Sequence, residues 1–170
     1  MGLENSTDGA SAAGGCLCGA IRYQLAQQPA RVTLCHCRFC QRSTGAAYMV
    51  QPACDGADFT VTQGRTKPYR HISAGSGEAI EIHFCDTCGT KIYQTFERFP
   101  GAVGLYSGTL DDPNWLQVTP EASKHIFLET ARTDTLLPAE TPLFKEHAMA
   151  ADGEAITPLV LDNPIPASEL

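Results

Sequence analysis

The chain has 170 residues, a formal net charge of −7 at pH 7 and a hydrophobic content of 43%. This length and apolar content predict one domain with a buried core. The negative charge, with no basic stripe, argues against nucleic-acid binding, and no apolar stretch approaches the length of a membrane span. We therefore expect neither a nucleic acid nor a membrane among its partners.

The N-terminal segment, residues 1–14, is small and polar, and we expect it to be disordered. Residues 1–15 contain neither the basic start nor the apolar run of a secretory signal peptide. This pattern favours a cytoplasmic protein whose thiols are reduced.

Short runs of alternating apolar and polar residues dominate the following part of the chain, and this period of two predicts half-buried strands. The runs cover residues 21–25, 59–61, 80–84 and 90–96, and two short apolar runs follow at residues 102–106 and 125–128. A helical turn is expected at residues 112–116, where Asp112 precedes Pro113. A folded domain is thus predicted over residues 15–146. Residues 147–170 form a C-terminal tail, either docked or loose.

Seven of the eight cysteines fall into three clusters whose spacing is typical of zinc ligands. The clusters are Cys16 and Cys18, then Cys35, Cys37 and Cys40, and finally Cys85 and Cys88. The two pairs together supply the four ligands of a closed, structural zinc site. The group of three leaves one position open, as catalytic zinc sites do. The sequence therefore predicts two Zn²⁺ sites, one structural with four cysteines and one labile with three.

Three other interpretations of these cysteines stay open. An even count is compatible with disulfides, although a C-x-C pair bonds to itself only with strain and a chain of this size needs no disulfide staples. An iron–sulfur cluster uses the same ligands, but the spacings differ from the ferredoxin runs. Both metals are structural if His36 completes the second site. Cys54 lies in a predicted turn outside the clusters and is expected to be a bystander thiol.

The residues around the clusters resemble the glutathione-dependent formaldehyde-activating enzyme (GFA) family, to which centromere protein V also belongs. The resemblance rests on GCLCGAIRY (15–23), CHCRFCQRSTGA (35–46) and FCDTCGT (84–90), followed by residues 108–113 and 125–127. It implies a mainly β, GFA-like fold of small packed antiparallel sheets, clamped by a structural zinc, with few short helical turns. It implies Cys16, Cys18, Cys85 and Cys88 as the structural ligands and Cys35, Cys37 and Cys40 as the catalytic zinc site.

The resemblance also implies an enzyme, a carbon–sulfur lyase that condenses glutathione with formaldehyde to S-hydroxymethylglutathione. Its partners would then be a small-molecule thiol, such as glutathione, and an aldehyde. This chain departs from the family pattern after His125, because many members carry a tryptophan soon after an arginine there, whereas this chain has Arg132-Thr133-Asp134. The identity of the thiol and aldehyde therefore stays open.

Chemistry at a three-cysteine zinc follows from its charge. Three thiolates leave a net charge of −1, which makes the metal a weak Lewis acid suited to another sulfur. A substrate thiol held there as thiolate would add to an aldehyde carbon. His36, His83 and His125 are candidates for proton transfer because the ordinary pKa of histidine lies near neutrality.

An anionic substrate would need basic residues at the site, and each one alone is expected to be a solvated surface cation. The candidates are Arg22, Arg38, Arg42, Lys91, Arg98, Lys124 and Arg132. Two other functions stay open. One is a different zinc enzyme acting on a C=N or C=O group, and the other is a non-catalytic, zinc-stabilised interaction module.

Overall fold

The computed structural model describes residues 11–150 and 152–170, and it divides them into two compact units that we treat separately. Unit 1 contains the chain up to Pro29 together with Cys54–Leu116, and unit 2 contains Ala30–Ala53 and Gln117–Leu170. The domain predicted over residues 15–146 therefore contributes to both units. Of the segment predicted to be disordered, residues 1–10 lie outside the described part, whereas Ala12 already begins a strand.

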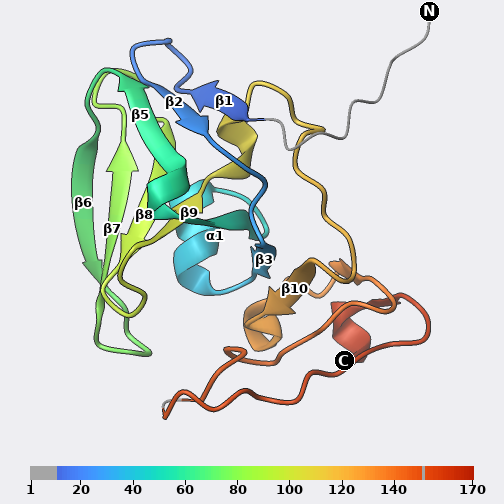
Figure 1. Ribbon diagram of the computed structural model, residues 1–170. Helices are drawn as coiled ribbons and strands as arrows, with labels where there is room; N and C mark the ends of the chain where they lie inside the picture. The colour runs from blue at the N-terminus through green and yellow to red at the C-terminus, as the bar shows by residue number, and fades with distance from the viewer. Residues whose placement is uncertain (1–10, 151) are drawn as a thin grey trace, which may run out of the picture. The chain divides into compact units, whose positions relative to one another are not determined.

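Unit 1 is built from antiparallel strands in two groups (Figure 1). One is a three-stranded sheet with the order β1 (Ala12–Gly15), β2 (Arg22–Leu25) and β5 (Phe59–Gln63). The other has neighbouring strands in the order β9 (Ala102–Leu105), β8 (Lys91–Phe96), β7 (Ala79–Phe84) and β6 (Lys67–Ile72). Two 3-10 turns, η1 (Gly56–Asp58) and η2 (Ser107–Thr109), complete the unit.

The core of unit 1 confirms the alternation predicted at residues 21–25. Ile21, Tyr23 and Leu25 are buried, and they pack in one cluster with Ile92 and Leu105. Burial raises the pKa of the Tyr23 hydroxyl to about 12, while the group keeps a partner, the Thr109 hydroxyl, at 2.9 Å. This buried polar group is thus hydrogen-bonded, as a buried hydroxyl must be to avoid a large desolvation cost.

Gly14 in β1 is required by the close approach of Tyr23. A methyl group at Gly14 would lie 2.3 Å from the ring of Tyr23 and 2.4 Å from the carbonyl oxygen of Thr109. Gly14→Ala is therefore expected to lower the free energy of unfolding by about 1–3 kcal/mol, the usual cost of overpacking. Denaturant unfolding measures this change, with Gly108→Ala as control because nothing lies within 4 Å of that position. Equal midpoints for the two variants would contradict the packing argument.

Unit 2 contains a small sheet with the order β10 (Ser123–Ile126), β3 (Arg31–Cys35) and β4 (Met49–Asp55), of which residues 49–53 belong to this unit. β3 pairs with β4 antiparallel but with β10 parallel. The parallel pair differs from the purely antiparallel sheets that we expected. It is possible because β3 and β10 come from well-separated segments of the chain, so no tight hairpin has to join them.

Among the described residues there is one α-helix, α1 (Arg38–Thr44), which the sequence pattern did not predict. Residues 112–116 form the expected turn, which does not continue into a helix. The Sγ atom of Cys37 accepts a hydrogen bond from the Cys40 backbone N–H at the start of α1, and Gly45 ends it in the left-handed region at φ 74°. Cysteine is an unusual N-cap residue, and seven residues are too few to display a helical period. Among the described residues, no helix has the length and apolar character to cross a membrane.

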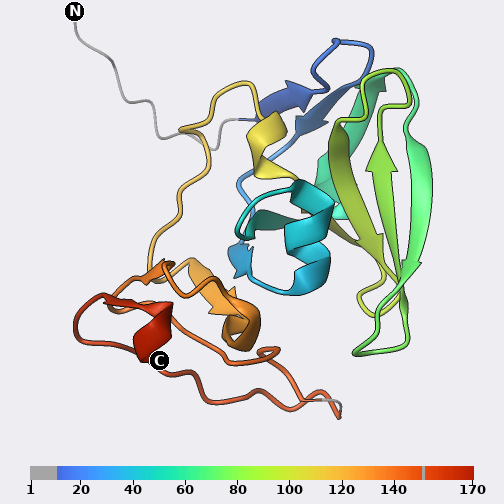
Figure 2. The same cartoon turned by 180° about the vertical axis from the view of Figure 1, so that it is seen from behind.

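The C-terminal tail is docked rather than loose. Leu159 and Leu143 exchange two backbone hydrogen bonds of 2.9 Å, and β12 (Ile165–Pro166) pairs with β11 (Leu136–Leu137). Leu161 and Leu170 pack against the core of unit 2, which contains Leu128, Leu137 and Leu143. Figure 2 shows this C-terminal segment folding back past β10. Unit 2 also contains two 3-10 turns, η3 (Leu128–Thr130) and η4 (Ala167–Glu169). The prediction of a mainly β fold of small sheets is thus confirmed.

Candidate metal centres

The first candidate centre lies in unit 1, where Cys16, Cys18, Cys85 and Cys88 converge although about 70 residues separate the two pairs. Their four Sγ atoms all lie within 4.8 Å of one another. Cys16 and Cys18 approach to 3.5 Å, and Cys18 and Cys85 to 3.7 Å. Tetrahedral zinc with bonds of about 2.3 Å separates its sulfur ligands by about 3.8 Å. The four cysteines therefore fit one closed tetrahedral metal site.

Two similar backbone turns present these cysteines. In the first turn Gly19 donates its N–H to the Cys16 carbonyl at 3.0 Å, and in the second Gly89 donates to the Cys85 carbonyl at 2.8 Å. Both glycines are left-handed, at φ 75° and 74°, a conformation that a residue with a side chain adopts only with strain. Each turn brings two sulfurs to one side of the chain.

Hydrogen bonds around this group favour the thiolate form that a metal requires. The side chain and the backbone of Thr90 donate hydrogen bonds to Cys88 and lower its pKa to about 5. The Ile21 backbone N–H reaches the Cys16 sulfur at 3.2 Å. Negative charge is thus stabilised on Cys16 and Cys88, whereas the neighbouring cysteine side chains raise the pKa of Cys18 to about 12.

The second candidate centre lies in unit 2 and contains Cys35, Cys37 and Cys40, whose Sγ atoms lie within 4.8 Å of one another. Cys35 ends β3, Cys37 caps α1, and Cys40 lies in its first turn. Cys35 and Cys40 are buried, each 5% exposed, whereas Cys37 is partly exposed. Within the described part of the chain, no histidine, aspartate or glutamate joins this group. It offers three sulfur ligands and leaves a fourth position for another donor.

Cys37 is the thiol of this group that ionises most readily. Hydrogen bonds from the side chains of Cys35 and Cys40, and from the backbone N–H groups of Cys40 and Phe39, lower its pKa to about 3. The interaction with Cys37 raises the pKa of Cys35 to about 12, and the pKa of Cys40 is also raised. Negative charge in this group is therefore favoured on Cys37, and a bound metal ion would favour the thiolate form of all three.

His36 does not complete the three-cysteine group. Its ring is fully buried and packs against Tyr48 in a tilted arrangement with a centroid distance of 4.9 Å. It stacks with His125, and its Nε2 lies 3.0 Å from Nδ1 of that residue. Burial lowers the pKa of both histidines to about 4. Nδ1 of His36 is buried with no hydrogen-bond partner. The alternative in which His36 serves as the fourth ligand is therefore not the arrangement in this structure.

Gln41, which no motif of the sequence marks as functional, holds the backbone next to the three-cysteine group. Its Nε2 atom donates to the carbonyl oxygens of His36 at 2.6 Å and Thr130 at 2.7 Å, and its Oε1 atom accepts from Arg38. The side chain is almost fully buried. Gln41 thus connects α1 to the backbone between two of the cysteines and to η3. The signal available in the sequence was its position directly after Cys40.

The other two residues considered from the sequence lie in unit 1 and outside both sulfur groups. His83 stacks on Tyr93 with a centroid distance of 4.1 Å and a 7° interplanar angle, and Nδ1 lies 3.2 Å from the Thr66 hydroxyl. This is the arrangement of a packed strand histidine. Cys54 is buried in the core of unit 1, which raises its pKa to about 11. Burial and a raised pKa fit the expected bystander thiol.

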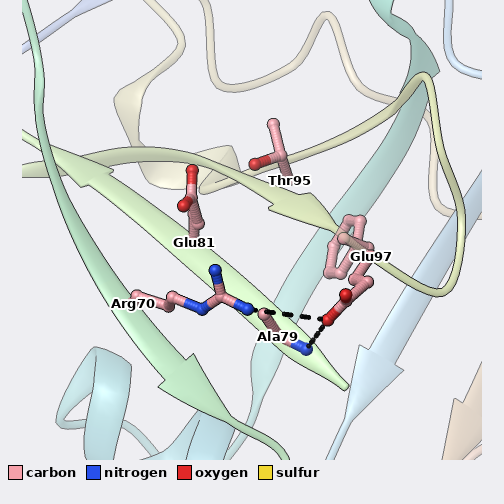
Figure 3. Close-up of a pocket in the computed structure, with 6 residues that line it drawn as sticks. Arg70, Ala79, Glu81, Thr95 and Glu97 are labelled. Atoms are coloured by element: carbon pink, nitrogen blue, oxygen red, sulfur yellow. Dashed lines mark hydrogen bonds and ion pairs between the residues drawn. The ribbon is translucent and has the colours of Figure 1, made fainter.

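A pocket on the β6–β8 surface of unit 1 carries no comparable chemistry (Figure 3). It has a volume of about 260 Å³ and is lined by Arg70, Glu81 and Glu97 among others. Arg70 lies 3.8 Å from the Glu97 carboxylate, which also accepts a 2.8 Å hydrogen bond from the Ala79 backbone. Arg70, the one cation that lines this pocket, is thus already paired with a carboxylate of the same pocket.

The fold and these two sulfur groups define a small, mainly β protein with two places suited to a thiolate-bound metal. A family model described as "Glutathione-dependent formaldehyde-activating enzyme" matches residues 11–130. The chain belongs to this family, which is a family of enzymes that act on glutathione-linked small molecules.

Among solved structures, the chain is similar to a crystal structure of a Rhodobacter sphaeroides protein. The sequence identity is 23% and the TM-score is 0.46, and the match covers 64% of this chain and 92% of the other. A comparison with curated proteins found no significant match.

Proposed function

We propose that this protein is a zinc-dependent carbon–sulfur lyase that forms or cleaves a thiol–aldehyde adduct such as S-hydroxymethylglutathione. The observation that carries the proposal is the separation of seven cysteines into a group of four and a group of three. The group of four accounts for a closed structural site by itself. The group of three is then free for substrate chemistry.

In this proposal Cys35, Cys37 and Cys40 hold the catalytic zinc, and Cys16, Cys18, Cys85 and Cys88 hold the structural zinc. When bound, the catalytic zinc supplies a position that keeps a substrate thiol in its nucleophilic thiolate form. Partial exposure makes Cys37 the sulfur of this group nearest to solvent, while Cys35 and Cys40 stay buried. Solvent therefore has access to one side of the group. Family membership supports both the thiol and the aldehyde as substrate classes.

Metal removal tests the proposal. Three ligands hold an ion less tightly than four, so mild chelation is expected to remove about one equivalent of zinc while the circular dichroism spectrum stays native. Exchange between free and adduct forms of glutathione and formaldehyde, followed by NMR, should then fall to the uncatalysed rate. Adding Zn²⁺ back should restore it.

Two outcomes would count against this proposal. Loss of both metals together with the fold would mean that both sites are structural and that neither holds a labile, catalytic zinc. Exchange at the uncatalysed rate before chelation, across a panel of thiols and aldehydes, would favour an enzyme that acts on a C=N or C=O group, or a non-catalytic module.

A further inference from the structure

A second pocket lies in unit 2, on residues that neighbour the three-cysteine group in the chain. It has a volume of about 290 Å³ and is lined by Arg38, Arg42, Arg132, Gln41 and the small residues 45–47. Arg38 directly follows Cys37, and Gln41 directly follows Cys40. The volume lies near the lower end of the range for ligand pockets, so it suits a part of a small molecule.

The pocket is held in shape by buried hydrogen bonds. Gln41 is 7% exposed, and its amide donates to the carbonyl oxygens of His36 and Thr130 while accepting from the Arg38 guanidinium. The Thr130 hydroxyl donates a second hydrogen bond to the His36 carbonyl oxygen, at 3.0 Å. Arg132 follows Thr130 by two residues. α1 and η3 are therefore joined at the pocket by a network to which the exposed Arg38 donates one hydrogen bond.

The pocket is strongly positive in a chain whose net charge is −7. Three arginines and no acidic residue line it. Within residues 11–150 and 152–170, Arg38 and Arg42 form no ion pair, and the hydrogen-bond partner of Arg38 is a neutral amide. Three of the seven candidate basic residues thus line this one pocket. The positive charges of Arg38 and Arg42 are not paired with any carboxylate among the described residues.

Arg132 already binds a carboxylate in this structure, through two hydrogen bonds to Asp134. Its Nε and one terminal nitrogen donate to the two carboxylate oxygens of Asp134 at 3.0 and 2.8 Å. This two-point pairing is the preferred geometry between arginine and a carboxylate. Asp134 is exposed and does not line the pocket, so it competes with a ligand for Arg132 without filling the space.

We propose that Arg38, Arg42 and Arg132 form a binding pocket for a carboxylate group carried by the thiol substrate. Two residues that line the pocket directly follow Cys37 and Cys40 in the chain, so we expect a thiol held by the three-cysteine group to place its carboxylate at these arginines. That the ligand is a thiol substrate rests on the proposed function. The binding of a carboxylate can be measured without any reaction.

Calorimetric titration with S-methylglutathione tests the pocket, because this probe has carboxylates but no thiol. Arg42→Gln and Arg38→Gln are each expected to weaken its binding roughly tenfold, the loss of one charge-assisted contact. Asp134→Asn should tighten it severalfold by releasing Arg132. Arg31→Gln is the matched control, because Arg31 is an exposed arginine of the same unit that does not line the pocket. The diethyl ester of the probe should bind more weakly than the acid.

Equal affinities in the wild type, Arg38→Gln and Arg42→Gln would overturn the inference, as would equal affinities for the acid and its diester. Binding of inorganic phosphate in place of the probe would overturn the carboxylate assignment. The proposed lyase activity fails separately. If no thiol–aldehyde exchange is catalysed but the probe still binds through the arginines, the pocket stands and the lyase proposal is rejected.

Discussion

Cys85→Ser is expected to leave the protein unfolded or insoluble. Cys85 is 1% exposed in the core of unit 1, and its sulfur belongs to the four-cysteine group. A structural zinc contributes on the order of 10 kcal/mol to folding at neutral pH, which is comparable to the whole stability of a typical domain. Losing one of four thiolates, with a polar hydroxyl left in its place, is therefore expected to remove most of the free energy that keeps the protein folded.

The comparison variant is Cys54→Ser, which makes the same chemical change at a buried cysteine outside both groups. It should lower the melting temperature slightly and keep the full metal content. The two proteins are compared by soluble yield, circular dichroism melting and zinc analysis. A soluble Cys85→Ser protein with unchanged metal content and melting temperature would refute the assignment of this site.

Cys37→Ser is expected to reduce catalysed thiol–aldehyde exchange by roughly 100-fold or more while the protein stays folded. Mutating the residues that hydrogen-bond to metal ligands already lowers metal affinity or activity by about 10–100-fold, and this change removes a ligand itself. The fold should survive because Cys37 serves as the N-cap of α1, accepting the Cys40 backbone N–H at 3.4 Å. Serine is among the preferred N-cap residues, so the start of the helix is preserved.

The assay follows NMR exchange of glutathione with formaldehyde first, then of other thiols and aldehydes, with the uncatalysed rate subtracted. Cys54→Ala serves as the reference, because it removes a thiol that belongs to neither group. We expect Cys54→Ala to keep wild-type exchange and Cys37→Ser to lose about one zinc equivalent. If Cys37→Ser exchanges as fast as the wild type across the whole panel, the lyase proposal is wrong.

Local pattern predicted the strands of unit 1 well because a strand with one buried face leaves a direct trace in the sequence. The alternation of Ile21, Tyr23 and Leu25 became a buried row in and beside β2. The local pattern did not predict α1, because this helix starts at a cysteine cap and is too short to show a helical period. It did predict the turn at residues 112–116, where the Asp112 carbonyl oxygen accepts from the Trp115 backbone N–H at 3.3 Å.

The sequence by itself determined the family, the mainly β class and the grouping of seven cysteines into a set of four and a set of three that could each hold a metal ion. Zinc-ligand spacing within each cluster is a local property that short turns enforce. Only the tertiary structure decided which side chains surround those sulfurs. His36, placed between two cysteines, turns toward His125 across 89 positions of sequence, and Arg38 and Arg42 meet Arg132 in one pocket. Such contacts depend on how distant segments pack, here through the parallel pairing of β3 and β10, and no local pattern encodes that register.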